Sequence, residues 1–146
     1  RRYPSLRTVF FGDHRKTVLR DGYLLSAIVL PVRTPGEGGA YEAFGLRATN
    51  FITVAGAAAS LRMDGGRCTR VRLALGAVAP TPILVDAVEE KLVGGALDND
   101  DLSAAADLAA AAARPISDIR GSAEHRRELV RELSIRALRT ARERAS

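Results

Sequence analysis

The sequence predicts an α+β fold, in which a three- to four-stranded antiparallel sheet is followed by a three-helix layer packed on one of its faces. Two observations carry this prediction: strand-like segments occupy the first half of the chain, and helix-like apolar periodicity occupies the second half. A third is size, because 146 residues with 47% hydrophobic content suffice for one domain with a core and are too few for two comfortable ones.

Three segments are predicted to form the strands of the sheet. The segment 23–32, YLLSAIVLPV, is short and apolar and has a proline near its end. The segment 33–40 combines a proline with three glycines and is expected to be a mobile connector. Alanine generally favours a helix, but β-branched residues lead into the alanine run of 44–63, and MDGG closes it like a hairpin turn. We therefore expect a long strand there, with 67–75 as the return strand and small inner side chains that let helices approach closely.

Three helices are predicted to follow the sheet. The first is expected at about 81–93, because a proline is tolerated in a first helical turn and two glycines follow. The second is expected at about 101–113, with acidic residues at its start, where the helix dipole favours them. The third is expected at about 122–144, with Ser122 as its N-cap.

The positive charge of the chain is concentrated at its two ends. A formal net charge of +5 and a pI near 10.1 suggest nucleic-acid binding as one function. In the last segment, however, glutamates and arginines alternate at helical spacing, which favours a solvated, salt-bridged helix. The expected pairs are Glu124–Arg127, Glu128–Arg131 and Glu132–Arg136. An aromatic content of 5% also leaves few platforms for stacking single-stranded nucleic acid.

Few residues have the spacing of a catalytic or metal site. His14 and His125 lie far apart, each beside an arginine, and are expected to be surface residues. Ser122 in GSAEH does not match a nucleophile elbow, which again favours a helix cap. The acids of LDNDD at 97–101 lack the glycine and distal glutamate of a calcium loop and are interpreted as helix-start acids. We therefore expect no catalytic residue and no metal site in this chain.

Arginines alternate with apolar residues along the predicted hairpin. Arg62, Arg70 and Arg72 are expected to cluster on its outer face. That cluster is either ordinary solvent-facing charge or a docking surface for a partner.

Cysteine content and hydropathy indicate the cellular setting. Cys68 is the one cysteine of the sequence, so there is no internal disulfide and no cysteine cluster for zinc or iron–sulfur ligation. This favours a reducing, cytoplasmic setting. No apolar run of about eighteen residues occurs, and RRYPSLRTVF lacks the apolar core of a signal peptide, so no membrane span is expected. The chain begins with Arg rather than Met, which is consistent with a piece of something longer.

Three segments in order carry a resemblance to a known family. They are GDHRKTVLRDGYLLSAIVLP at 12–31, RCTRVRLALGAVAPTPILVDAVEEKLVG at 67–94 and ARPISDIRGSAEHRRELVRELSIRAL at 113–138. The combination of ALGAVAPTP with PISDIRGSAEHRR is the most specific part. These segments resemble the C-terminal part of the FAD-binding, medium subunit of molybdenum hydroxylases, the family of the carbon monoxide dehydrogenase flavoprotein and the flavin domain of xanthine dehydrogenase.

The resemblance implies a cofactor and partners. Such a subunit belongs to an FAD-containing oxidoreductase: it receives electrons from two [2Fe–2S] clusters in a small subunit, after a molybdenum cofactor in a large subunit has oxidised the substrate, and it passes them to an external acceptor. Residues 1–20 resemble the tail of the preceding FAD-binding region, and residues 21–146 resemble the C-terminal domain. The family's glycine-rich FAD loops, AGGxS and TIGGN, do not occur here. This chain alone is therefore expected to be inactive and to bind FAD weakly or not at all.

One cofactor-binding residue is implied by the same resemblance. Leu25, in YLLSAIVLP, matches a leucine on the flavin side of the cleft. Ala43 replaces a lysine that often precedes the family's FG, and Phe51 stands before Ile52 without the usual nearby aspartate. The leading hypothesis is a domain that forms part of the flavin cleft and contacts other subunits. The alternative is an independent basic α+β module that binds nucleic acid or a protein partner.

Overall fold

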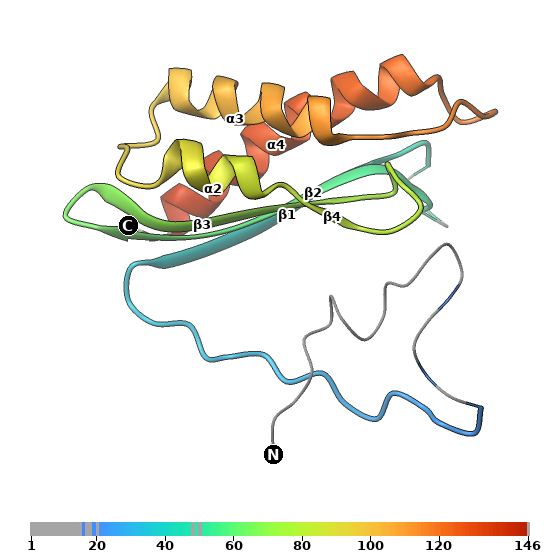
Figure 1. Ribbon diagram of the computed structural model, residues 1–146, viewed down its shortest axis with the longest axis horizontal. Helices are drawn as coiled ribbons and strands as arrows, with labels where there is room; N and C mark the ends of the chain where they lie inside the picture. Colours follow the sequence, from blue (N-terminus) through green and yellow to red (C-terminus); the bar gives the residue numbers. More distant parts are fainter. Residues whose placement is uncertain (1–15, 17–18, 20, 48, 50, 146) are drawn as a thin grey trace. The chain divides into compact units, whose positions relative to one another are not determined.

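The computed structural model describes residues 16, 19, 21–47, 49 and 51–145. The chain divides into two compact units, Arg1–Val32 and Arg33–Ser146. In the first unit the described residues 21–32 form neither a helix nor a strand. In the second unit a sheet carries three helices, as expected (Figure 1).

The sheet has four antiparallel strands in the order β1-β2-β3-β4. They are β1 (Glu37–Gly45), β2 (Thr53–Asp64), β3 (Arg67–Gly76) and β4 (Ile83–Leu84). β2 and β3 form the predicted hairpin, with Gly65 and Gly66 at φ of 54° and 77° in its turn. The expected long strand at 44–63 is wrong in its first part, because residues 44 and 45 end β1 and β2 begins only at Thr53. Two consecutive positive φ values suit a tight hairpin turn that glycine adopts without strain.

The first strand does not lie where the sequence analysis placed it. Residues 23–32 were expected to be a strand, but no described residue pairs with them and their large apolar side chains are exposed. A strand needs a neighbour for its backbone N–H and C=O groups, so an apolar segment without a partner remains irregular. The strand that pairs with β2 is β1, which begins inside the expected connector 33–40.

Close packing explains why a glycine-rich segment forms β1. A Cβ built at Gly38 would overlap the carbonyl oxygen of Ala141, in the last helix. The glycine is thus required because a helix backbone crosses the strand there. Glycine in a strand can mark such a close approach of another backbone as well as a turn.

Three helices follow: α2 (Asp86–Leu92), α3 (Asn99–Ala112) and α4 (Ala123–Ala145). The first begins later than expected, because Ile83 and Leu84 pair with β3 as β4 before the chain turns into α2. The other two agree with the prediction to within two residues. Within the described ranges, no helix combines the length and the apolar composition needed to cross a bilayer.

All three helices cover the same face of the sheet (Figure 1). α4 contacts β1 and β2, α2 contacts β3, and α3 lies against α4 and α2. As expected, small side chains dominate the inner face of β2 under α4, and they are followed by branched ones on β3. The buried residues of this face are Ala55, Ala57, Ala59, Leu61, Val71, Leu73 and Leu75.

One polar side chain in the core has no partner among the described atoms. Ser134 of α4 is fully buried, and its Oγ makes no hydrogen bond. A buried hydroxyl that loses its water without gaining a partner destabilises the fold. We expect Ser134→Ala to leave the free energy of unfolding unchanged or to raise it by up to about 1 kcal/mol, as measured by urea denaturation. A clear loss of stability would mean that the hydroxyl has a partner in solution.

Candidate functional site

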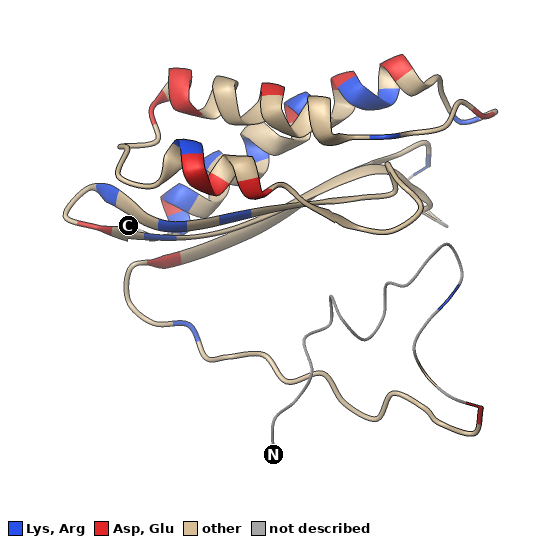
Figure 2. Cartoon of the chain, viewed as in Figure 1, with Lys and Arg blue, Asp and Glu red and all other residues tan. Residues whose placement is uncertain are grey.

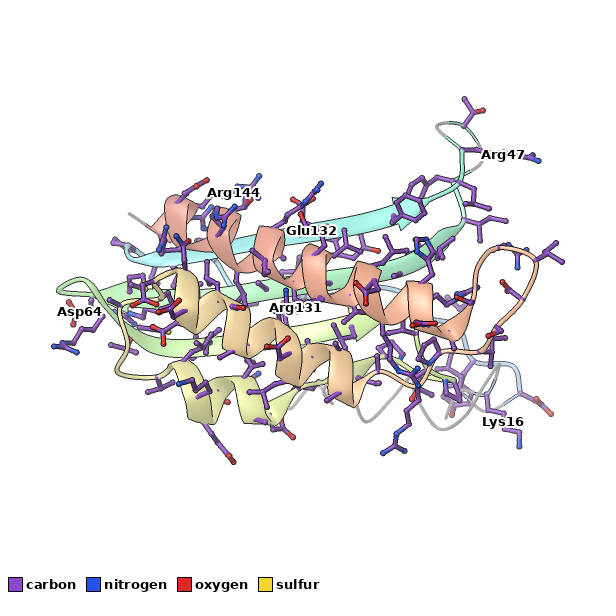
Figure 3. All side chains as sticks on the ribbon, turned by 90° about the horizontal axis from the view of Figure 1, so that it is seen from above. Lys16, Arg47, Asp64, Arg131, Glu132 and Arg144 are labelled. Atoms are coloured by element: carbon purple, nitrogen blue, oxygen red, sulfur yellow. The ribbon has the colours of Figure 1, made fainter. Side chains whose placement is uncertain are left out.

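A hollow of about 420 Å³ lies at one end of the sheet. It is lined by Leu46, Arg47, Ile52, Ile119 and Arg120. Two connections supply these residues: the one between β1 and β2, and the one between α3 and α4. Seen from above, Arg47 marks this end, opposite the hairpin that carries Asp64 (Figure 3).

The lining of the hollow is apolar and exposed. Leu46, Ile52 and Ile119 are all more than half exposed, and Ile119 reaches 97%. Phe51 and Ile116 add two further exposed apolar side chains in the same connections. Apolar side chains gathered around a hollow indicate a surface that a ligand or another part of a protein covers.

Asp118 shapes the connection that carries Ile119 and Arg120. Its backbone exchanges two hydrogen bonds with Gly121, both of 3.1 Å. Its Oδ1 accepts a hydrogen bond from the backbone N–H of Arg120 at 2.8 Å, and its Oδ2 accepts one from Nη1 of Arg120 at 3.3 Å. A carboxylate that bonds the backbone two residues on is a common way to stabilise a tight turn.

Arg126 anchors this turn to the sheet. Its side chain is only 6% exposed, and its Nη2 donates to Oδ1 of Asp118 at 2.6 Å. Its Nη1 donates to the carbonyl oxygen of Val54, at the start of β2, at 2.9 Å. The Arg120 N–H and the Arg126 guanidinium together hold the pKa of Asp118 below its ordinary value. Asp118 is therefore an anion at neutral pH.

Helix α4 begins directly after the turn. Ser122 Oγ accepts a hydrogen bond from the N–H of His125 at 3.1 Å, so the predicted N-cap is confirmed. Ser117 Oγ accepts another from the N–H of Ala123 at 2.8 Å. His125 is exposed, and its ring packs edge-on against the ring of Phe44, with 6.2 Å between the ring centroids. His14, the other histidine, lies outside the described residues.

The side chains that line the hollow are suited to binding a ligand. In the described part of the chain, no group of three or more His, Cys, Asp or Glu side chains could hold a metal ion. Burial raises the pKa of the Cys68 thiol, which makes it a poor nucleophile. Asp98 Oδ1 accepts a hydrogen bond from the N–H of Asp101 and caps α3, and Asp100 and Asp101 lie in the first turn of α3, so these are helix-start acids as expected. What remains is a hollow with aliphatic walls and two guanidinium groups, suited to a ligand with an apolar face and negative charge.

Comparison with known proteins shows the family to which this chain belongs. The model of the CO dehydrogenase flavoprotein C-terminal domain matches residues 39–141. The chain belongs to this family. The carbon monoxide dehydrogenase medium chain of Afipia carboxidovorans is 40% identical over 129 residues, which cover 88% of this chain and 44% of that relative. The xanthine dehydrogenase FAD-binding subunit of Escherichia coli O157:H7 is 30% identical over 96% of this chain and 48% of its own length.

Solved structures show the same relationship. Carbon monoxide dehydrogenase from Hydrogenophaga pseudoflava superposes with a TM-score of 0.88 at 34% identity, covering 94% of this chain and 47% of that one. Quinoline 2-oxidoreductase from Pseudomonas putida 86 superposes with a TM-score of 0.84 at 31% identity, and the match covers 95% of this chain and 48% of that one. The chain therefore spans about half the length of the relatives it matches, and the resemblance stated from the sequence is confirmed at the level of the family.

Leu25, the cofactor-binding residue predicted from the sequence, lies in the first compact unit. Its side chain is 46% exposed, and it precedes the part that the family model matches. The described lining of the hollow belongs wholly to the second unit. The role of Leu25 stays a prediction.

Ala43 lies in β1 and is half-buried.

Arg62, Arg70 and Arg72 lie together on the outer face of the hairpin, as expected. Figure 2 shows basic residues at several places along this hairpin. Arg70 Nη2 bonds Oε1 of Glu37 at 2.6 Å across the sheet. Part of this positive charge is therefore paired within the domain, and docking to a partner stays a prediction.

The residues that build the hollow were not recognised from the sequence. PISDIRGSAEHRR was singled out as a family segment, but no role was given to Asp118, Arg120 or Arg126. One signal was available, since two isoleucines stand in a short connection between a proline and a glycine, where polar residues are usual.

Proposed function

We propose that this chain is the C-terminal part of an FAD subunit of a molybdenum-dependent hydroxylase or dehydrogenase, with residues 1–20 as the tail of the preceding FAD-binding region and 21–146 as the C-terminal domain. The observation that carries the proposal is the hollow itself. This chain belongs to a family of flavoprotein domains, and it has an exposed apolar hollow at one end of its sheet, where a ligand or a second domain would cover it. The function of the domain is to form one wall of the flavin cleft.

The residues of the hollow fit part of FAD. Aliphatic side chains of Leu46, Ile52 and Ile119 suit the flat apolar face of an isoalloxazine ring and exclude water from it. The guanidinium groups of Arg47 and Arg120 suit its carbonyl oxygens or other negative groups. When bound, FAD supplies the electron transfer, and the chain supplies position and charge. Because the glycine-rich loops AGGxS and TIGGN are absent, most of the binding energy would come from the preceding region.

The complete enzyme would contain two further subunits. A small subunit would carry the [2Fe–2S] clusters, and a large subunit would carry the molybdenum cofactor, with the FAD subunit passing electrons to an external acceptor. Relatives named as medium chains and FAD-binding subunits support this assembly. We place the enzyme in the cytoplasm, since the one cysteine is a free thiol and fits a reducing setting. This chain alone would be inactive.

The alternative function, a basic module that binds nucleic acid, was based on the positive charge of the last helix, and the structure pairs much of that charge within the domain. Arg126 is buried, Arg136 bonds Glu132 at 2.7 Å as expected, and Arg131 bonds Asp107 of α3 at 2.7 Å instead of the expected Glu128. The arginines of α4 therefore serve the fold to a large extent, and no comparison points to nucleic acid.

The test of the flavin-cleft proposal is Leu25→Asp in the complete FAD subunit. A carboxylate placed against an apolar ring face loses hydration, so we expect FAD affinity to fall about tenfold or more. FAD retained per subunit after gel filtration and the dissociation constant from flavin fluorescence measure this.

Leu24→Asp is the matched control for this test. Leu24 is the neighbour in sequence and is more exposed, at 78% against 46% for Leu25. Its replacement is expected to leave FAD affinity unchanged. Equal FAD retention in both variants and the parent subunit would contradict a role for Leu25 in the cleft.

A further inference from the structure

We propose that Asp118 and Arg126 are a positioning pair that presents the Arg120 guanidinium to the ligand in the hollow, and that Asp118 acts on the ligand through Arg120 rather than through its own charge. The inference rests on the proposed function, in which that ligand is the flavin of the complete subunit.

The pair joins the two walls of the hollow. Arg126 uses one nitrogen for Asp118, in the connection that carries Ile119 and Arg120, and the other for Val54, two residues after Ile52. A guanidinium is planar and rigid, so these two hydrogen bonds fix the turn relative to the start of β2. Arg126 itself is buried and does not line the hollow.

Asp118 transfers this fixed position to Arg120. One carboxylate oxygen accepts from Arg126 Nη2 and from the Arg120 N–H, at 2.6 and 2.8 Å. The other oxygen accepts from Arg120 Nη1 at 3.3 Å. The Arg120 backbone and side chain are therefore both held by one group.

Arg120 keeps the capacity to bind a ligand. Its side chain is 41% exposed at the hollow, and a guanidinium has five N–H donors, of which Asp118 engages one. An arginine that is held in place loses less rotamer entropy when it binds than a mobile one does. The pair thus makes the positive charge at the hollow more effective without contacting the ligand.

The consequence is a specific effect on flavin. Two-electron reduction gives a flavin that carries negative charge, so a well-placed guanidinium stabilises the reduced form over the oxidised form. Releasing Arg120 should weaken binding of the reduced form more than of the oxidised form. If that difference is about tenfold, the midpoint potential falls by about 30 mV for a two-electron couple.

The sign of the shift separates positioning from direct charge. Asp118→Asn removes a negative charge, and by direct electrostatics alone this would raise the flavin midpoint potential. If Asp118 acts by positioning Arg120, the same substitution lowers the potential. We expect it to fall.

A double-mutant cycle in the complete FAD subunit tests this. The variants are Asp118→Asn, Arg120→Ala and their combination, with the midpoint potential of bound FAD, FAD affinity and melting temperature as readouts. We expect Asp118→Asn to lower the potential in the parent and not in the Arg120→Ala background. Arg126→Lys keeps the charge and loses the two-sided link, so it should lower the potential as Asp118→Asn does.

Asp107→Asn is the matched control. It breaks an Arg–Asp ion pair between exposed side chains, with Arg131 at 2.7 Å, outside the described lining of the hollow. Asp107→Asn is expected to leave the midpoint potential of bound FAD unchanged. If it shifted the potential as Asp118→Asn and Arg126→Lys do, the shift would result from lost stability and not from the position of Arg120.

The outcomes separate two failures. If Arg120→Ala changes neither the potential nor FAD affinity, the hollow does not face the flavin, and the proposed function of the hollow fails together with this inference. If Arg120→Ala lowers the potential but Asp118→Asn raises it or leaves it unchanged, only the positioning role is overturned. The same holds if Asp118→Asn lowers the potential equally in both backgrounds.

Discussion

Gly38→Ala is expected to lower the free energy of unfolding by roughly 3 kcal/mol or to prevent folding, because the added methyl group would overlap the backbone of α4. The atoms it would meet are the carbonyl oxygen of Ala141 and, at 2.9 Å, the backbone nitrogen of Ala145. Backbone atoms of a helix cannot rotate away as a flexible side chain can. α4 also contacts β2 and α3, so moving it would open the whole core. Urea denaturation followed by circular dichroism measures the loss.

Gly39→Ala is the matched control for this prediction. The nearest atom to a Cβ at position 39 is the carbonyl oxygen of Ala59 at 3.5 Å, an ordinary contact. Alanine has less backbone conformational entropy than glycine in the unfolded chain, so Gly39→Ala should leave the free energy of unfolding unchanged or raise it slightly. If both variants were equally stable, α4 would not cross β1 as closely as the structure shows.

Arg126→Met is expected to lower the free energy of unfolding by about 2–3 kcal/mol. The substitution removes the donor to the buried carbonyl of Val54 and the cation beside Asp118, and methionine offers neither a donor nor a charge. The connection that carries Ile119 and Arg120 would lose its anchor to the sheet. Urea denaturation gives the stability, and hydrogen exchange of the Arg120 amide reports the release of the turn.

Arg127→Met supplies the control, since Arg127 is the next residue on α4 and is exposed. An exposed arginine on a helix contributes little, so this variant should remain within about 0.5 kcal/mol of the parent. Equal stability of the two variants would show that the hydrogen bonds of Arg126 do not contribute net stability.

The segment 23–32 and strand β1 show where prediction from the sequence failed. YLLSAIVLPV has the local composition of a strand, yet nothing in the described part of the chain pairs with it. RTPGEGGA at 33–40 has the composition of a connector, yet its last four residues pair with β2 as the start of β1. Strand formation depends on a neighbouring strand, and glycine content cannot distinguish a turn from a close helix crossing.

The candidate site was predictable only in part. The family and its flavin were inferred from PISDIRGSAEHRR and ALGAVAPTP, and the family is confirmed. The roles of single residues in those segments were not, because Arg126 looks like one more charge of a salt-bridged helix. Its burial becomes visible only when β2 and the turn at Asp118 are placed beside it.

By itself, the sequence determined the α+β class, the β2–β3 hairpin, the positions of α3 and α4 and the family. These features depend on local periodicity, turn glycines and helix caps, all of which act over a few neighbouring residues. Only the tertiary structure decided which segment forms the first strand, why Gly38 must be glycine and how Arg126 links Asp118 to Val54. Those features depend on contacts between residues far apart in the chain, and such contacts arise only when the core packs.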